Sequence, residues 1–152
     1  MTYPVLLILH LFAALIFIGT VFFEVLILEG VRRRMPAAPM RELEQAISAR
    51  ARSLMPWVLL VLFSAGLGLG WHHRAALMTP LAGGFGTLLA LKIALALSVF
   101  GHFLLAMRWR GCGQMSSVRF RRLHLSVFCH MVAIVLLAKS MFYVHGLAAP
   151  PS

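Results

Sequence analysis

The chain has 152 residues, of which 61% are hydrophobic and 12% are charged, and its mean hydropathy is +0.91. A soluble domain of this length carries roughly twice that share of charged residues, so the composition predicts residence in a membrane. Its 14 Lys and Arg residues outnumber its 4 Asp and Glu residues. The basic residues cluster beside apolar segments and no nucleic-acid-binding motif is present, so a nucleic-acid partner is not expected.

Four apolar runs follow one another along the chain, each close to the roughly 20 residues that a membrane-spanning helix needs. They cover residues 4–28, 54–71, 85–107 and 123–144. Pro4 and Pro56 fit the first turns of the first two runs, where a missing N–H does no harm. The sequence therefore predicts an all-α fold, an integral membrane four-helix bundle that forms a single domain over residues 1–152. No internal repeat is expected.

The arginines lie in the segments that connect these runs. The first and third connections carry nearly all of them: Arg32, Arg33, Arg34, Arg41, Arg50, Arg52, Arg108, Arg110, Arg119, Arg121 and Arg122. The second connection carries only Arg74, and the C-terminal tail has no Lys or Arg. The positive-inside rule then predicts a multi-pass protein of the bacterial inner (plasma) membrane with both termini on the periplasmic side. Residues 40–47 are patterned as an amphipathic helix, either on the inner surface or extending the second span.

A few polar side chains fall inside the apolar runs, at two depths. His10, Lys92 and Lys139 lie about 10 Å from the outer surface, and His102 and His130 lie about 22–24 Å from it. A cation or imidazole at such depth is costly unless it faces the protein interior, has a partner or serves a site. Lys139 points almost opposite to His130 on the last helix and can reach the interface, so Lys92 is the better candidate for a buried site.

Two imidazoles from neighbouring helices at one depth are what a six-coordinate haem iron requires. His102 and His130 meet this condition on consecutive, antiparallel helices, and a four-helix bundle can hold a haem between its helices. His10 is the third candidate metal ligand, at a second site nearer the outside. The sequence therefore predicts one or two haem b groups, with His10, His102 and His130 as the iron ligands.

Other residues complete the predicted cofactor site. His72, His73 or Lys92 is the expected partner of the outer histidine. Arg74 outside and Arg108 inside are candidates for pairing with haem propionates. Gly66 and Gly70 form a small-xxx-small pair on the second span, which allows close helix contact or leaves room for a flat cofactor.

Two other interpretations of these residues remain open. A histidine in a membrane span often only hydrogen-bonds to a neighbouring helix. Copper is the chief alternative metal, since nine methionines and seven histidines could bind it, although no MxxM or MxM cluster occurs. The chain has no Asp, which argues against a catalytic triad, and it has no P-loop. Cys112 and Cys129 are expected to be free thiols.

Several short segments resemble the HemJ-type protoporphyrinogen oxidases and the related CopD-type copper-resistance membrane proteins. They are Leu7–Phe12 in the first span, Arg50–Pro56 at the entry to the second, the lysine and glycine-histidine positions Lys92, Gly101 and His102 of the third, and Leu136–Lys139 in the fourth. The resemblance implies a four-helix membrane fold that binds haem b in the HemJ branch, with the position of His10 implicated, and takes up copper in the CopD branch.

The chain also departs from these families. Arg122–Leu125 stands where the HemJ type carries Asn-Glu-x-Pro, and His130 is additional. These differences favour a haem-binding, electron-transfer relative over a HemJ-like protoporphyrinogen IX oxidase or a CopD-like copper transporter, and leave open whether the protein is an enzyme. The expected partners are the lipid bilayer, a quinone or porphyrin, and a second copy of the chain.

Overall fold

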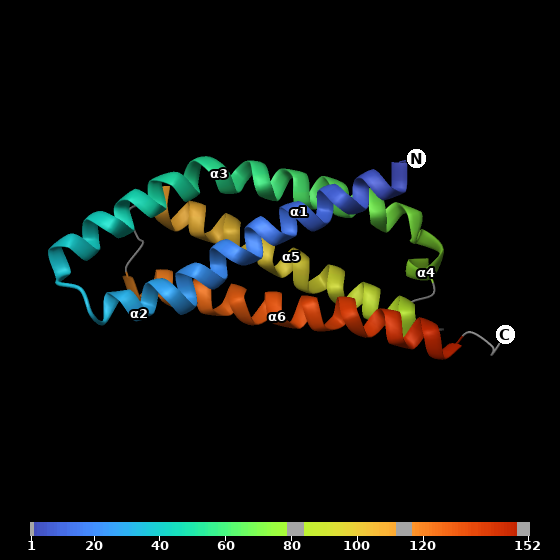
Figure 1. The fold of residues 1–152 in the computed structure, drawn as a ribbon. Coiled ribbons are helices and arrows are strands. Elements are labelled where there is room, and N and C mark those ends of the chain that lie inside the picture. The colour runs from blue at the N-terminus through green and yellow to red at the C-terminus, as the bar shows by residue number, and fades with distance from the viewer. Residues whose placement is uncertain (1, 79–83, 112–116, 149–152) are drawn as a thin grey trace. The chain divides into compact units, whose positions relative to one another are not determined.

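The computed structural model describes residues 2–78, 84–111 and 117–148, and all regular structure among them is helical (Figure 1). The elements are α1 (Thr2–Phe22), the π-helix η1 (Phe23–Leu28), α2 (Glu29–Arg32), α3 (Ala37–His72), α4 (Arg74–Met78), α5 (Gly84–Gly111) and α6 (Ser117–Ala148). The all-α prediction is confirmed.

Within the described residues, four helical segments are long and apolar enough to cross a membrane. They are Thr2–Arg32, Ala37–His72, Gly84–Trp109 and Arg121–Met141. Large apolar side chains point outward along them; Leu15 is 67% exposed and Trp57 is 68% exposed. Such exposure would be costly in water and is expected in lipid. The predicted spans 4–28, 54–71, 85–107 and 123–144 lie within or largely overlap these segments.

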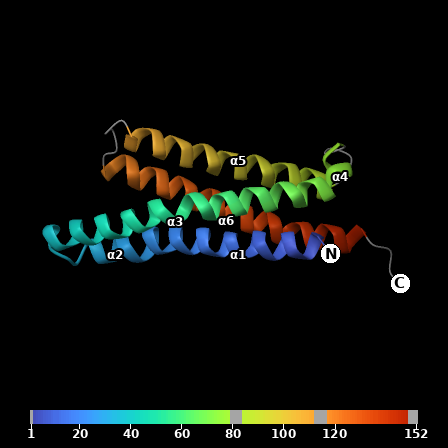
Figure 2. The ribbon, with the colours of Figure 1, turned by 90° about the horizontal axis from the view of Figure 1, so that it is seen from above.

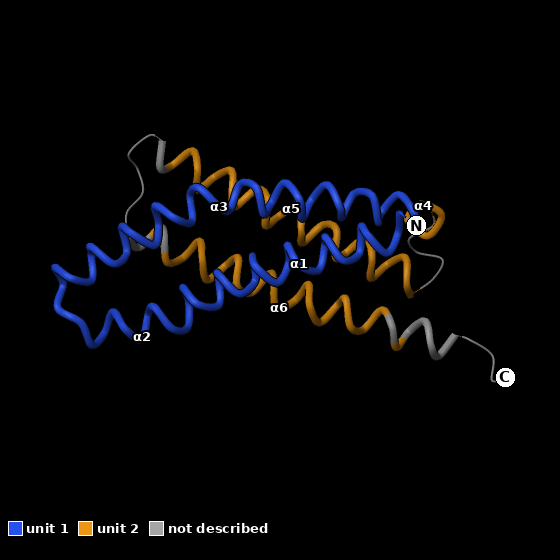
Figure 3. The backbone as a smooth tube through the Cα atoms, turned by 45° about the horizontal axis from the view of Figure 1, so that its top comes forward, with its two compact units in different colours: residues 1–72 blue, residues 73–152 orange. Residues whose placement is uncertain are grey.

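The chain divides into two compact units, residues 1–72 and residues 73–152, which are coloured separately in Figure 3. Each unit is built on a pair of long helices. α1 packs along α3 in the first unit, and α5 packs along α6 in the second, as Figure 2 shows. A single bundle of all four spans stays a prediction.

The second span is part of a much longer helix than its apolar run. α3 begins at Ala37, so the amphipathic segment 40–47 is continuous with the span. Pro56 therefore lies in the helix interior, and its predicted place in a first turn is wrong. Proline at this position leaves the carbonyl of Arg52 without its usual intrahelical donor. Membrane helices tolerate such breaks because neighbouring groups can satisfy the freed backbone.

The first span changes its pitch before it ends. Ala13, Phe17 and Val21 form the buried face of α1, at the spacing of an ordinary α-helix. From Phe23 the backbone forms a π-helix, in which each hydrogen bond spans five residues where an α-helix spans four. Leu28 is the next buried residue. An apolar side chain is therefore buried on both sides of the change in pitch.

An ion-pair cluster joins the short helix α2 to α3. The Nε and Nη2 atoms of Arg32 donate to one carboxylate oxygen of Glu44, at 2.7 and 2.5 Å, and its Nη1 atom donates to Glu29 one turn earlier. The side chain of Arg32 is 36% exposed. Exposed pairs contribute at most about 1 kcal/mol, so the cluster fixes the local geometry more than it stabilises the fold.

Candidate functional site

His10 is built into the contact between α1 and α3. Its Nδ1 atom lies 3.0 Å from the carbonyl oxygen of Leu62. A carbonyl can only accept, so Nδ1 carries the proton, and in the neutral ring Nε2 is the unprotonated nitrogen. A Cβ atom on Gly66 would lie 3.2 Å from Cε1 of the ring. Of the two roles considered for Gly66, the structure shows close helix contact, with an imidazole filling the space that glycine leaves.

His102 and His130 lie side by side on α5 and α6. Their ring centroids are 5.2 Å apart and their planes are tilted by 57°. Each ring is tied to its own helix by Nδ1, which donates to the carbonyl oxygen of the serine four residues earlier, at 2.7 Å for Ser98 and 2.8 Å for Ser126. The prediction that consecutive helices bring these two rings together is confirmed.

The outer nitrogen of each ring reaches the opposite helix. The hydroxyl of Ser126 on α6 donates to Nε2 of His102, and the hydroxyl of Ser98 on α5 donates to Nε2 of His130, both at 3.0 Å. The donor assignment follows from the Nδ1 bonds, since a neutral imidazole with a protonated Nδ1 has only an acceptor at Nε2. The four side chains therefore form one closed set of hydrogen bonds, and all four are half-buried.

The three histidines share a feature of metal ligands. A metal-bound imidazole usually donates its other N–H to a carbonyl or a carboxylate, which fixes the tautomer and the ring orientation. His10, His102 and His130 all do so. In the His102–His130 pair, the lone pair of each Nε2 atom accepts a hydrogen bond from a serine hydroxyl. If His102 and His130 held a haem iron, their Nε2 atoms would have to give up both serine hydrogen bonds.

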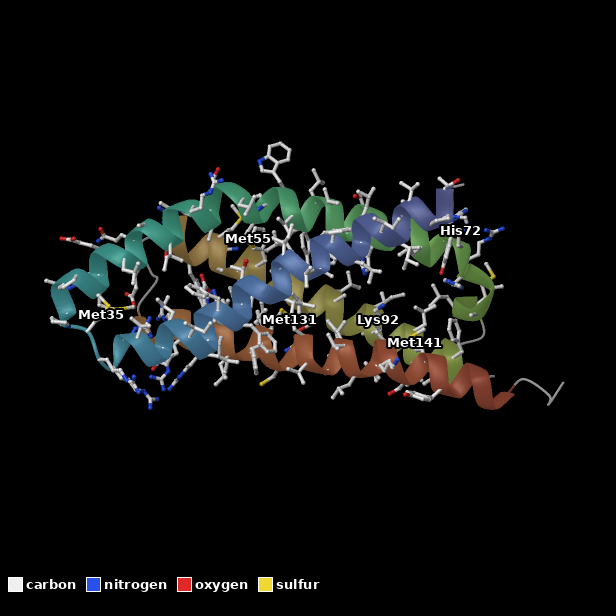
Figure 4. The ribbon with its side chains drawn as sticks, viewed as in Figure 1. Met35, Met55, His72, Lys92, Met131 and Met141 are labelled. Carbon is white, nitrogen blue, oxygen red and sulfur yellow. The ribbon has the colours of Figure 1, made fainter. Side chains whose placement is uncertain are left out.

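The two lysines of the spans have different surroundings. Lys139 is exposed, and its Nζ atom lies 5.6 Å from the ring centroid of Tyr143 one turn further along α6. That placement agrees with the expected outward orientation of Lys139. Lys92 is half-buried on α5, where Figure 4 labels it. Of the two, Lys92 therefore remains the candidate for an interior role.

The remaining predicted site residues lie at helix ends. His72 is exposed at the end of α3, edge-on to Tyr3 at 5.5 Å between ring centroids. His73 packs against Phe85 with centroids 5.7 Å apart, and Arg74 is exposed at the start of α4. Across the residues that the structure describes, no three His, Cys, Asp or Glu side chains gather as a metal-binding group.

Of the two cysteines, Cys129 is an exposed free thiol on α6, as predicted. Cys112 lies outside the described residues.

The serines of the histidine pair were not predicted, although the sequence holds a signal for them. Ser98–His102 reads Ser-Val-Phe-Gly-His, and Ser126–His130 reads Ser-Val-Phe-Cys-His. The expectation that the chain has no internal repeat is therefore wrong at the scale of five residues. Serine and histidine four positions apart share one helix face, so two such helices place both residue types in one contact.

Comparison with known proteins adds no relative, because no protein-family model, no curated protein and no solved structure matches the chain. The fold and the site define a class: a helical protein with four segments able to cross a membrane, which carries ordered histidines inside its helix contacts. The likeness to HemJ-type and CopD-type proteins rests on the short sequence segments alone.

Proposed function

We propose that the protein is a multi-pass membrane protein that binds haem b and transfers electrons, with His10 as a ligand that would hold the iron. The observation that supports this best is the hydrogen bond from Nδ1 of His10 to the carbonyl of Leu62. It leaves Nε2 as the basic nitrogen and fixes the direction of the ring, as metal-binding histidines require. The resemblance of Leu7–Phe12 to the HemJ type implicates the same residue.

The three histidines differ in their hydrogen-bond partners. At His102 and His130 each Nε2 atom accepts a hydroxyl hydrogen bond, and a metal would have to displace it. His10 is held by a hydrogen bond to the backbone carbonyl of Leu62 and by close packing at Gly66. The haem would supply the redox chemistry, while the protein supplies ligation and an apolar surrounding. Within the unit that contains His10, His72 stays a candidate for the second ligand.

An absorption spectrum tests the proposal directly. The full-length protein purified in mild detergent should show the reduced-minus-oxidised bands of a b-type haem, with iron in stoichiometric amount. The His10→Ala variant should lose or shift these bands. The matched control is His124→Ala, a histidine of α6 that is not among the predicted ligands, which should leave them unchanged. A colourless wild-type protein, or His10→Ala with unaltered bands, would refute the assignment.

The same preparation separates the alternatives. A colourless protein that retains copper would favour the CopD-like interpretation. Haem bands together with oxidation of added protoporphyrinogen IX would favour the HemJ-like one. Reduction of the haem by a quinol without porphyrinogen oxidation is the result expected for an electron-transfer protein. If His102→Ala or His130→Ala bleaches the spectrum and His10→Ala does not, the iron is on the inner pair instead.

We further propose that the chain resides in a bacterial inner membrane with both termini outside. The support is the segregation of the arginines between the connecting segments. Fusions of a reporter after Ser152 test this. A periplasm-dependent phosphatase should be active there and a cytoplasm-dependent fluorescent protein should be dark, and the reverse pattern would exclude the orientation.

A further inference from the structure

We infer that the two Ser-Val-Phe-x-His segments form a self-complementary motif that pairs antiparallel membrane helices and fixes their register. We call its four polar side chains, Ser98, His102, Ser126 and His130, the Ser–His clasp. Each histidine of the clasp accepts a hydrogen bond from the hydroxyl of the serine on the opposite helix. Each also donates a hydrogen bond to a backbone carbonyl of its own helix. This role is independent of any cofactor and goes beyond the proposed function.

Burial along the two segments supports the symmetry of the motif. Val99 and Val127, which follow the serines, are both buried, with 4% and 5% exposure. Gly101 and Cys129, which precede the histidines, are both exposed. At four of the five positions, all but that of the phenylalanines, the two segments therefore have matching burial. That is the result expected if a local two-fold axis relates the helices.

The spacing of the motif specifies both direction and register. Ser98 pairs with His130 and His102 pairs with Ser126, so the order along one helix is reversed along the other. Parallel helices could satisfy one of these pairs but would carry the other two residues away from each other. Sliding an antiparallel pair by one turn, about four residues, would place serine against serine or histidine against histidine. Unsatisfied polar groups are costly in lipid, so the observed register is favoured over its neighbours.

Other serines of the spans show that this arrangement is specific. The hydroxyl of Ser140 donates to the carbonyl of Leu136, and that of Ser64 donates to the carbonyl of Val61, both on their own helices. A bond to the preceding turn is the default for a serine in a helix. Ser98 and Ser126 instead direct their hydroxyls across the helix contact. A histidine acceptor opposite each of them accounts for the difference.

Nitrogen NMR of the full-length protein in detergent tests the clasp without relying on activity. His102 and His130 should both be neutral with the proton on Nδ1, the less common tautomer of free histidine. Ser126→Ala should shift the Nε2 signal of His102 and spare that of His130, and Ser98→Ala should do the converse. Ser140→Ala is the matched control and should move neither. The inference would be overturned if the Nε2 atoms carried the protons in the wild-type protein, or if the Nε2 signal of His102 did not shift in Ser126→Ala.

Thermal unfolding supplies an independent test of coupling. Ser98→Ala should lower the unfolding midpoint of the wild-type protein by roughly 2–4 °C, whereas Ser140→Ala should leave it in place. In a His130→Ala background the Ser98→Ala change should have no further effect, because its partner is already gone. Equal shifts in both backgrounds would show that the two residues do not act together and would refute the clasp.

Discussion

Nδ1 of His10 donates a hydrogen bond to the carbonyl oxygen of Leu62, across the contact between α1 and α3. Leu62 lies one turn before Gly66, the residue that makes room for the same ring. The imidazole is therefore held by two successive turns of one helix, by a hydrogen bond at the first and by close packing at the second. Both restraints should be separately measurable.

Alanine at Gly66 should disrupt this contact. The added Cβ would lie 3.2 Å from Cε1 and 3.3 Å from Nδ1 of His10, so the ring has to move and its bond to Leu62 weakens. We expect a loss of about 1–3 kcal/mol in the free energy of unfolding, measured by thermal or denaturant unfolding in detergent.

Gly70→Ala is the matched control for Gly66→Ala. Nothing lies within 4 Å of a Cβ at Gly70. Alanine is the better helix former, so this variant should be neutral or more stable by up to about 1 kcal/mol. Equal destabilisation by the two variants would contradict the role given to Gly66.

Removal of Arg32 should have a small effect that depends on salt. Arg32→Met deletes the bonds to Glu29 and Glu44 at a partly exposed site, so the free energy of unfolding should fall by no more than about 1 kcal/mol. The difference from wild type should shrink as ionic strength rises, because salt screens exposed charges. Glu44→Gln should reproduce most of the effect, and a salt-independent loss would count against the ion pairs as its cause.

Lys139 should be dispensable both for the stability of the fold and for haem absorption. It is exposed on α6 and contacts Tyr143 through an exposed cation–π geometry, which contributes about 1 kcal/mol or less. Lys139→Leu should therefore change the free energy of unfolding by less than about 1 kcal/mol and leave any haem bands unaltered. A bleached Lys139→Leu protein would place this lysine at the cofactor, contrary to its outward position.

Cys129 should react only with reagents that enter the bilayer. With Cys112→Ser, Cys129 is the sole thiol of the chain, and it is exposed on a predicted span. A lipophilic maleimide should label it in membranes, whereas a charged, impermeant maleimide should not.

Two variants in a cysteine-free background calibrate the labelling of Cys129. Gly101→Cys, at the exposed equivalent position of α5, should behave as Cys129 does, and Val127→Cys, which is buried, should resist both reagents. Labelling of Cys129 by the impermeant reagent would show that it faces water.

The sequence predicted the spans well and the site only in part. Long apolar runs give a strong signal, so the four helices followed from composition and length. The equal depth of His102 and His130 on two consecutive helices was enough to predict that their side chains meet. The serine partners were missed because depth alone does not reveal which polar group lies opposite, and because a five-residue repeat was overlooked.

Hydrophobic runs and residue spacing did not predict two local features. The π-helix Phe23–Leu28 has no distinctive residue pattern. The position of Pro56 was misjudged because the polar first half of α3 hid its continuity with the apolar half.

The π-helix Phe23–Leu28 makes the C-terminal end of the first span tolerant of a change in length. A π-turn accommodates one residue more than an α-turn, so deleting a single residue there would convert it to an ordinary turn. The N-terminal part of the span, with His10, would keep its place against α3, and so would Arg32 beyond the deletion. The same deletion between Ala13 and Val21 would instead rotate one part of the helix against the other by about 100°. The first span is thus a place where a missing residue can be absorbed without disturbing either end.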